Sequence, residues 1–318
     1  MTPRILITRP LPEAVIAEAQ KHFRVEVRDK VTPLTRTERR AALALHDGIL
    51  PTLGDNFNAQ VLDGGPHRCK ILANFGVGYN HIDVAAAAAN GVAVSNTPGA
   101  VTDATADIAL MLMLMTCRRA GQGERMVRAG HWTGWHPTQM LGLHLSGKRL
   151  GIVGMGRIGQ AVARRAHFGF GMEVAYVNRS AKDVDFPAVQ VATLGELAAQ
   201  VDVLVVAVPG GAKTRHLIGA DVFAAMPPHG HFVNVARGDV VDEAALIAAL
   251  QTGQIAGAGL DVYENEPEVP EALRALENVT LLPHLGTAAL EVRVAMGLMA
   301  VENLRAFFAG EDLPNAVG

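Results

Sequence analysis

A glycine-rich turn near the middle of the chain restricts its fold more than any other feature. The turn follows the short apolar run 149–153 and opens a segment with helical spacing, and its glycines stand in the pattern GxGxxG. In such a turn the first glycine permits a sharp bend, the second lets the backbone approach a pyrophosphate, and the third lets the helix pack against the strand. The unpaired N–H groups at the helix N-terminus attract the phosphates. The predicted cofactor-binding residues of this turn are Gly154, Gly156, Arg157, Ile158 and Gly159.

Short apolar runs alternate with helix-compatible segments over most of the chain. This alternation predicts parallel sheets with helices on both faces. The strands expected in the first hundred residues are 4–8, 23–27, 47–51 and 70–75. The later ones are 149–154, 173–178, 201–208, 231–236, 256–262 and 279–284. Two longer helical stretches, at 102–119 and 288–309, interrupt this pattern.

The two blocks of strands predict an α/β fold with two domains, since 318 residues exceed the size of most single domains. We expect both domains to be doubly wound parallel sheets. A flavodoxin-like substrate (catalytic) domain is expected over 1–98 plus 288–318, and a Rossmann dinucleotide-binding domain over 99–287. The long helices would link the two domains.

Composition excludes several classes of protein and of site. Hydrophobic residues make up 49% of the chain and charged residues 19%, as in well-buried globular proteins. A net charge of −3 without long Lys/Arg clusters argues against nucleic acid or an acidic membrane surface as a partner. The apolar run 108–117 is too short to cross a bilayer. Cys69 and Cys117 form no metal-binding pattern and favour a reducing compartment, so we expect no metal and a cytoplasmic protein.

The end of the strand after the glycine turn decides between NAD and NADP. Enzymes that use NAD place Asp or Glu there, about 20 residues after the turn, to bind the ribose 2′-hydroxyl. This chain has Asn178 at that position, followed by Arg179 and Ser180. The missing carboxylate removes a repulsion of the 2′-phosphate, and a guanidinium supplies charge-assisted hydrogen bonds. These residues predict NADP(H) in preference to NAD(H); the alternative is that Arg179 is an ordinary solvated side chain.

Three residues of the second block have the chemistry that the dehydrogenation of a 2-hydroxy acid requires. Such a reaction needs a cation for the carboxylate, an acid/base for the hydroxyl proton, and often a carboxylate that holds the base. Arg237, Glu266 and His284 stand at the ends of predicted strands or in the loops that follow them. Ligand sites in such sheets lie beyond the carboxyl ends of the strands, so we expect these side chains to converge. Taken singly, each also has a purely structural interpretation.

Several stretches in one order along the chain carry a family resemblance. They are 74–83, 96–107, the glycine turn, 234–246, 257–267 and 281–286. With them the chain resembles the D-isomer-specific 2-hydroxyacid dehydrogenases over nearly its whole length. The resemblance implies that Arg237 binds the substrate carboxylate and carbonyl, while Glu266 pairs with His284, which donates the proton. It also implies that backbone N–H groups at Val77 and Gly78 bind the substrate carboxylate.

The same resemblance implies further contacts with the cofactor, several of them around the nicotinamide. One of these residues lies in the first long helix, and the others follow strand ends or the catalytic histidine. They are Thr105, Val208, Pro209, Val235, Ala236, Asp261 and Gly286.

The segment 130–142 is similar to the glyoxylate/hydroxypyruvate reductases of this family, which share its WTxW pattern. Those enzymes are dimers in which this segment forms part of an arm around the partner, so a homodimer is implied. Trp135 would then reach the neighbouring subunit's active site and limit substrate size. The alternative is that Trp132 and Trp135 are ordinary interface anchors. Where those reductases carry a further Trp, this chain has Met140, so its pocket is expected to differ.

Together these features predict an oxidoreductase that transfers hydride from NADPH to a short 2-keto acid of the glyoxylate/hydroxypyruvate type, giving a D-2-hydroxy acid. NAD-linked oxidation of another D-2-hydroxy acid is one alternative, against which the missing acid at Asn178 stands. A non-catalytic nucleotide-sensing scaffold, like the corepressors built on this fold, is the other, because those keep similar active-site residues. The expected partners are the small acid and a second copy of the chain, not nucleic acid or a membrane.

Overall fold

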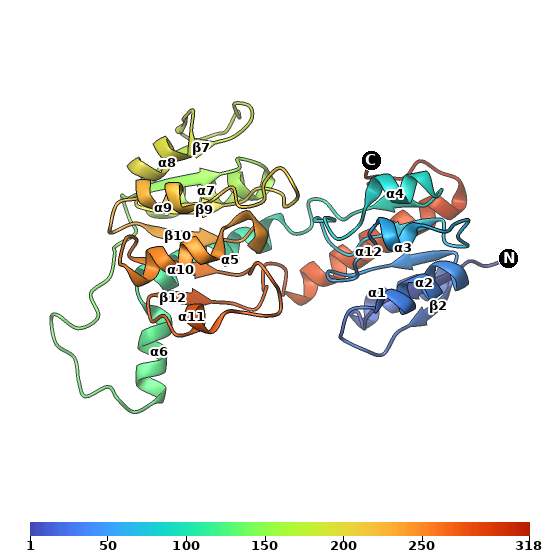
Figure 1. Cartoon of the computed structure of the whole chain (residues 1–318), viewed down its shortest axis with the longest axis horizontal. Helices are drawn as coiled ribbons and strands as arrows, with labels where there is room; N and C mark the ends of the chain where they lie inside the picture. The colour runs from blue at the N-terminus through green and yellow to red at the C-terminus, as the bar shows by residue number, and fades with distance from the viewer. The chain divides into compact units, whose positions relative to one another are not determined.

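The computed structural model describes residues 1–318 and separates them into two compact units (Figure 1). Unit 1 consists of Met1–Val101 and Thr287–Gly318, and unit 2 consists of Thr102–Gly286. The chain therefore leaves unit 1 once and returns to it for its last segment. These limits lie a few residues from the boundaries expected after residues 98 and 287.

Unit 1 is built on a sheet of five strands whose neighbours are all parallel. The strands are β1 (Arg4–Ile7), β2 (Arg24–Val27), β3 (Gly48–Leu50), β4 (Ile71–Ala73) and β5 (Ala93–Ser95). Their order, β2-β1-β3-β4-β5, is that of flavodoxin-like folds, so the predicted fold class is confirmed for this unit. Strand β5 is absent from the prediction because its three residues form no extended apolar run.

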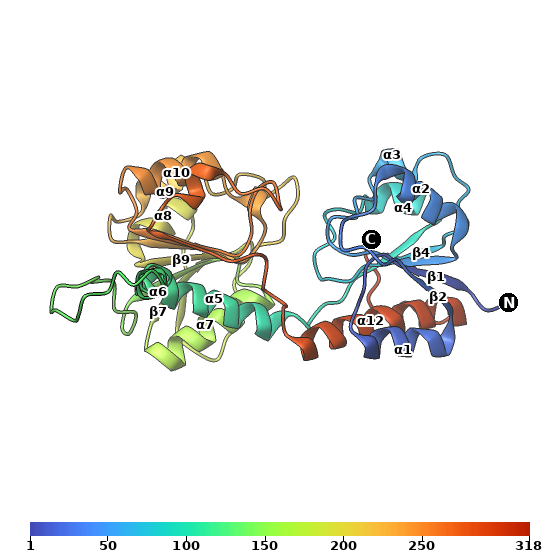
Figure 2. The ribbon, with the colours of Figure 1, turned by 90° about the horizontal axis from the view of Figure 1, so that it is seen from below.

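Helices cover both faces of this sheet, with α1 and α12 on one side and α2, α3 and α4 on the other (Figure 2). They are α1 (Glu13–His22), α2 (Arg36–Leu45), α3 (Ala59–Leu62), α4 (Val84–Ala89) and α12 (Leu290–Ala309). Helices α1 and α12 touch at Gly297, where a Cβ would lie 2.4 Å from Cγ2 of Val15. Leu304 of α12 is fully buried, so the last helix of the chain completes the core of unit 1.

Unit 2 is built on a seven-stranded sheet, again with parallel neighbours only. The strands are β6 (Arg149–Val153), β7 (Glu173–Val177), β8 (Ala188–Gln190), β9 (Val203–Val206), β10 (His231–Asn234), β11 (Gly257–Leu260) and β12 (Val279–Leu281). Their order, β8-β7-β6-β9-β10-β11-β12, is the Rossmann order extended by one strand. Strand β8 is absent from the prediction, since it is a mostly exposed edge strand of three residues.

Helices also cover both faces of the unit 2 sheet (Figure 2). On one face lie α5 (Thr102–Cys117) and α7 (Arg157–Phe170), and on the other lie α8 (Leu194–Gln200), α9 (Ala220–Ala225) and α10 (Glu243–Gln251). The shorter elements are α6 (Ala120–Arg128), α11 (Glu271–Arg274) and a 3₁₀ turn at Gly238–Val240. Each face has its own cluster of buried apolar side chains, as a doubly wound sheet requires.

The apolar run within α5 is buried in unit 2. Both cysteines are free and buried, and burial raises the pKa of each thiol to about 12, which leaves them unreactive. In the whole chain there is no helix with the length and apolar character needed to span a membrane.

The helix expected at 102–119 ends at Cys117. The segment that follows forms an arm, defined here as α6 with residues 129–147. The arm extends away from the sheet of unit 2 (Figure 1). Helix α6 buries none of its residues, and the rest of the arm has no regular secondary structure. Leu145 near its end is buried, but three of its apolar side chains are exposed, with 53% of Trp132, 78% of Trp135 and 68% of Leu141 accessible.

Candidate active site

The glycine turn between β6 and α7 requires glycine at specific points. Gly154 has φ of +96°, and a Cβ there would lie 2.6 Å from Cγ1 of Val208. A Cβ on Gly159 would lie 2.1 Å from the carbonyl oxygen of Gly154, so the helix meets the strand only without a side chain. Gly156 is the N-cap of α7 and has open space where a Cβ would be. The turn therefore leaves room for a phosphate at the helix N-terminus.

A cavity of about 740 Å³ adjoins this turn and the ends of β6, β7 and β9. Residues expected to bind the cofactor line it: Gly154, Gly156, Asn178, Arg179, Ser180, Val208 and Pro209. Arg157, Ile158 and Gly159 belong to α7 and lie outside this lining. The lining contains no carboxylate, whereas Lys182 and Lys213 accompany Arg179 as further cations. The residues present thus fit a dinucleotide, with its phosphates at the helix N-terminus and cations around the adenosine end.

Asn178 holds the walls of this cavity together. Its Oδ1 accepts a hydrogen bond from the backbone N–H of Met155 at 3.2 Å, and its Nδ2 donates to the carbonyl oxygen of Ser180 at 2.8 Å. Its own carbonyl oxygen accepts from Gln190 at 2.8 Å. The amide therefore connects the end of β7 to the glycine turn and shapes the loop that carries Arg179.

His284 and Glu266 form a hydrogen-bonded pair after β12 and β11. Nδ1 of His284 donates to Oε2 of Glu266 at 2.8 Å, and the backbone N–H of Tyr263 donates to Oε1 at 3.1 Å. Burial raises the pKa of the Glu266 carboxyl, but the hydrogen bond and charge of His284 outweigh burial and lower the pKa overall. The carboxylate therefore stays ionised and orients the ring, which leaves Nε2 for proton transfer.

A second carboxylate fixes the backbone around His284. Asp261 accepts hydrogen bonds from the N–H groups of Leu285 at 2.6 Å and Gly286 at 2.8 Å. The Thr105 hydroxyl donates to the carbonyl oxygen of Gly286 at 3.1 Å. His284 has φ of +55°, a conformation that a residue with a side chain keeps only when its surroundings impose it. The structure thus brings Thr105, Asp261 and Gly286 together at the turn that presents the histidine.

Arg237 follows β10 in the same unit, directly after the buried residues Val235 and Ala236. Its Nη1 donates to the carbonyl oxygen of Ala236 at 2.6 Å. Burial lowers the pKa of the guanidinium, and the charge of Glu266 opposes that effect, so the two groups lie within electrostatic reach. A Cβ on Gly210 would lie 2.7 Å from Cγ of Arg237, which shows how closely the loop after β9 packs on this side chain. The three predicted catalytic residues therefore share one neighbourhood.

In unit 1 the loop expected to bind the substrate follows β4. Asn74 donates from Nδ2 to the carbonyl oxygens of Gly76 at 2.9 Å and Gly78 at 3.0 Å. Asn96 donates from Nδ2 to the carbonyl oxygen of Val77 at 2.8 Å. These bonds hold the carbonyl groups of the loop, while the N–H groups of Val77 and Gly78 donate to no group of the protein. Unused N–H groups of this kind suit a carboxylate.

Comparison with known proteins decides the family of the chain. The NAD binding domain of D-isomer specific 2-hydroxyacid dehydrogenases matches residues 110–286. The chain belongs to this family. It is therefore an oxidoreductase of the NAD(P)-dependent 2-hydroxyacid dehydrogenases, as predicted.

Relatives of this dehydrogenase match it over its full length. A glyoxylate reductase of Thermococcus onnurineus is 42% identical over 323 residues, which cover 100% of this chain and 96% of the relative. A glycerate dehydrogenase of Hyphomicrobium methylovorum is 36% identical and covers 99% of this chain and 98% of its own length. Among solved structures, the NADPH-dependent glyoxylate/hydroxypyruvate reductase of Sinorhizobium meliloti in complex with NADP and malonate is 40% identical. Its TM-score is 0.89, with 100% of this chain and 97% of the other covered.

Some residues that build the site in this dehydrogenase are absent from the prediction. Asn74 and Asn96 shape the substrate loop, Tyr263 supports Glu266, and Lys182 and Lys213 line the cofactor cavity. Lys182 stands two residues after Ser180, so its position next to the discriminating segment was a usable signal. Asn74, Asn96 and Tyr263 lie in the stretches that carry the family resemblance, but their roles depend on contacts with the backbone that the pattern does not show.

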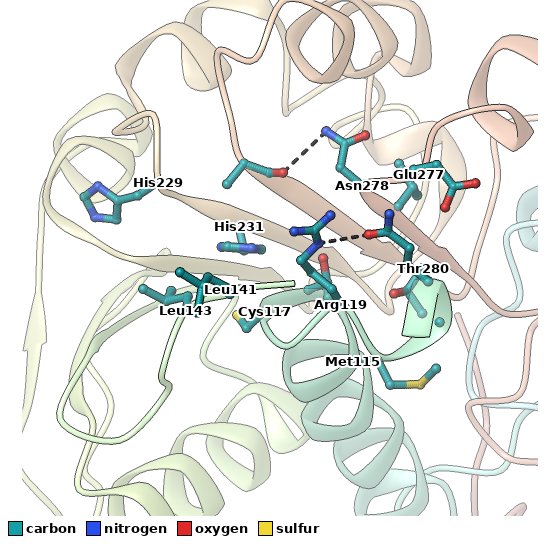
Figure 3. Close-up of a pocket in the computed structure, with 16 residues that line it drawn as sticks. Met115, Cys117, Arg119, Leu141, Leu143, His229, His231, Glu277, Asn278 and Thr280 are labelled. Atoms are coloured by element: carbon teal, nitrogen blue, oxygen red, sulfur yellow. Dashed lines mark hydrogen bonds between the residues drawn. The ribbon is translucent and has the colours of Figure 1, made fainter. Parts of the chain in front are cut away.

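The dehydrogenase has a second cavity, of about 570 Å³, at the opposite edge of the unit 2 sheet (Figure 3). The end of α5, the arm, and residues at the starts of β10, β11 and β12 line it, and no predicted site residue does. Two buried atoms in its lining, Nδ1 of His231 and Oγ1 of Thr116, have no hydrogen-bond partner. Arg119 lies among these side chains and donates from Nε to Gln122 at 2.9 Å.

Proposed function

We propose that this dehydrogenase works as an NADPH-dependent reductase of short 2-keto acids, of the glyoxylate and hydroxypyruvate type, and forms D-2-hydroxy acids. The observation that carries the proposal is the His284–Glu266 pair beside Arg237, in the unit that also holds the dinucleotide cavity. The names of the relatives, glyoxylate reductase and NADPH-dependent glyoxylate/hydroxypyruvate reductase, support the same substrate class.

The three side chains have separate roles in the proposed reaction. Arg237 neutralises the substrate carboxylate and polarises the keto group, because a buried guanidinium interacts strongly with both oxygens. His284 gives its Nε2 proton to the carbonyl oxygen, which becomes the hydroxyl. Glu266 holds the ring through Nδ1 and balances the charge of the imidazolium. The bound nicotinamide supplies the hydride that the carbonyl carbon accepts.

The loop after β4 in unit 1 has a proposed role in binding the substrate. The free N–H groups of Val77 and Gly78 are oriented by Asn74 and Asn96 and would donate to the substrate carboxylate. Two neighbouring N–H donors match the two oxygens of a small carboxylate. This role accounts for the rigid binding of the carbonyl groups in that loop.

The preference for NADPH is inferred from the lining of the cofactor cavity. Arg179, Ser180 and Lys182 follow β7, Lys213 lies in the loop after β9, and no carboxylate is present to bind a ribose 2′-hydroxyl. A 2′-phosphate would meet cations and a hydroxyl in place of a repelling acid. We also place the enzyme in the cytoplasm, since its two free cysteines suit a reducing compartment.

A homodimer is part of the proposal, and the arm is its basis. Exposed Trp132, Trp135 and Leu141 on a segment without regular structure are what an interface with a second copy would cover. The arm also borders the cavity of Figure 3, which a second copy would close. Trp135 would then reach the substrate site of the partner. Light scattering should give twice the mass of the 33.6 kDa chain, and Trp135→Ala should broaden the range of accepted keto acids.

The decisive experiment is the steady-state reduction of glyoxylate and of hydroxypyruvate with NADPH and NADH side by side. Fast turnover that favours NADPH would support both the substrate class and the cofactor. Equal rates with NADH would retain the reaction and overturn the cofactor preference. If neither acid reacted with either nucleotide, a bulkier keto acid or a nucleotide-sensing scaffold would replace the proposal.

A further inference from the structure

The turn after β11 carries two glutamates that face different partners. Glu266 holds His284, whereas Oε1 of Glu264 accepts hydrogen bonds from Nη2 of Arg215 at 2.9 Å and from Nε2 of His216 at 2.7 Å. The Glu264 side chain is only 17% exposed, whereas that of Arg215 is 56% exposed, so the inference rests on the two hydrogen bonds that Glu264 accepts and not on a buried ion pair. We propose that Glu264 is a positioning residue that couples a wall of the cofactor cavity to the turn carrying Glu266. The inference rests on the proposed function.

The partners of Glu264 belong to the loop 209–217 after β9. The residues of this loop from Pro209 to Thr214 line the cofactor cavity. The Thr214 hydroxyl donates to the carbonyl oxygens of Pro209 at 2.7 Å and Gly211 at 3.2 Å, which closes the loop on itself. The residues that line the cavity are therefore hydrogen-bonded to one another within the same loop that continues into Arg215 and His216.

The same loop is anchored beside Arg237. The backbone N–H of His216 donates to the carbonyl oxygen of Asp239 at 2.8 Å, and His216 has φ of +48°, which a residue with a side chain rarely adopts. A conformation of this kind persists only when the surrounding contacts impose it. Glu264 supplies one of those contacts directly, through Nε2 of the ring.

The turn 263–266, which carries both Glu264 and Glu266, is held by hydrogen bonds and close packing. The N–H of Tyr263 donates to Glu266 at 3.1 Å, and the N–H of Glu264 donates to Oε2 of Glu243 at 3.4 Å. A Cβ on Gly238 would lie 1.8 Å from the carbonyl carbon of Tyr263, so the turn rests directly on the backbone that follows Arg237. A displacement of the Glu264 backbone would therefore also displace Glu266, which stands two residues later.

Charge gives a second reason for the arrangement. Burial raises the pKa of the Glu243 carboxyl, and the nearby charge of Glu264 raises it further. The N–H of Glu264 donates to Glu243, and Glu266 stands two residues further along the same turn. Arg215 offsets the charge of Glu264, while Glu266 pairs with His284.

The coupling is tested by a double-mutant cycle with Glu264→Gln, Arg215→Ala and the two combined. The measurements are the NADPH dissociation constant, from fluorescence titration, and the single-turnover rate of hydride transfer to glyoxylate at saturating NADPH. Each single change should raise the NADPH dissociation constant and also slow hydride transfer. The two effects multiplied together should amount to about tenfold for each single variant. The double variant should be no worse in either quantity than the poorer single variant. Arg215 pairs with Glu264 and not with Glu266 or His284, so a slower transfer in Arg215→Ala that is not additive with Glu264→Gln indicates transmission through Glu264. Additive effects, or an unchanged transfer rate in both single variants, would overturn the proposal.

Two further variants separate coupling from loss of folding. Glu302→Gln removes a carboxylate paired with Arg305 in unit 1 and should leave both measurements unchanged. Glu264→Asp keeps the charge and should restore part of the transfer rate. If Glu264→Gln does not fold, His216→Gln and Arg215→Ala form an equivalent cycle that leaves the turn intact.

A wild-type chain that binds NADPH but reduces no keto acid would contradict the proposed function, whereas an active wild type with an additive cycle would contradict only the coupling.

Discussion

Two histidines, one at each edge of the unit 2 sheet, differ in their hydrogen-bond partners. At the carboxyl edge, His284 is paired with a carboxylate at 2.8 Å, and Asp261 accepts two backbone hydrogen bonds. At the amino edge, His231 has no partner for Nδ1, and burial lowers its pKa to about 4. The histidine at the carboxyl edge is therefore oriented by a carboxylate, whereas burial favours the neutral ring of His231 at the amino edge.

The direction of the strands and helices explains why the predicted catalytic residues and the glycine turn lie at the carboxyl edge. In a parallel doubly wound sheet the helices that follow the strands begin at the carboxyl edge, where their N–H groups attract anions. Helix α7 begins there at Gly156, whereas α5 ends at the opposite edge at Cys117. Anionic cofactors and substrates are favoured at the carboxyl edge for this reason. The cavity at the amino edge is lined by Arg119, Glu277 and two histidines, His229 and His231.

The largest difference between the two edges should appear in catalysis. Replacing His284 with Ala removes the proton donor, so turnover in keto-acid reduction should fall by about 10²–10⁴-fold while NADPH binding stays nearly unchanged. The matched variant His231→Ala should keep wild-type turnover, since that ring lies at the other edge. Rates from stopped-flow absorbance of NADPH check both. Wild-type turnover in His284→Ala would remove the histidine from the mechanism.

The next difference concerns stability against pH. His231 titrates near pH 6.5 in the unfolded chain and at about 4 in the folded one, so the unfolded state binds more protons between these values. The contribution of this ring to stability is complete above pH 6.5 and is lost as the pH falls toward 4. The loss amounts to about 3 kcal/mol, since each pKa unit corresponds to about 1.4 kcal/mol.

This pH effect is isolated by comparison with a ring that cannot titrate. Unfolding free energies from urea titrations at pH 7.5 and pH 5 should differ less in His231→Gln than in the wild type. Parallel losses in the two proteins would mean that the ring is protonated in the folded state, contrary to its buried, unpartnered environment.

A smaller effect is expected at the rim of the cofactor cavity. Arg179→Ala should raise the KM for NADPH by about tenfold and leave the KM for NADH unchanged, because only the 2′-phosphate loses a charge-assisted partner. Arg164→Ala is the matched control, since Arg164 pairs with Asp185 and does not line the cavity. Equal losses with both nucleotides would show that Arg179 does not distinguish them.

The carboxyl edge was largely predictable from the sequence, because its function depends on residue types at strand ends. The glycine pattern and the positions of Arg237, Glu266 and His284 needed only the locations of strands and the chemistry of the side chains. Asn178 shows the limit of this approach. Asn178 lines the cavity beside the glycine turn, and its side chain binds the backbone of Met155 and Ser180, a role that spacing alone does not reveal.

The amino edge and the sheet margins were poorly predictable for a different reason. Strands β5 and β8 hold three residues each, too few for an apolar run, and they exist because neighbouring strands offer hydrogen bonds. Helix α6 buries nothing, so no apolar periodicity marks it. The cavity around His231 joins α5, the arm and three strand starts, and such long-range packing leaves no local signal.

The smallest predicted effect compares two threonines of α5, one near each edge. Thr105 and Thr116 are both 6% exposed, but the Thr105 hydroxyl donates to Gly286 at 3.1 Å and the Thr116 hydroxyl has no partner. Thr105→Val should cost about 1 kcal/mol, because the change loses a buried hydrogen bond and leaves the Gly286 carbonyl unsatisfied. Thr116→Val should be neutral or stabilising by up to about 1 kcal/mol, because the desolvated hydroxyl it removes gains nothing in the folded chain. Relative to the wild type, the unfolding free energy should therefore fall in Thr105→Val and stay equal or rise in Thr116→Val. Equal destabilisation would mean that the hydroxyl of Thr116 has a partner in solution, with bound water or a second copy of the chain as the candidates, and the amino edge would then be satisfied in the same way as the carboxyl edge.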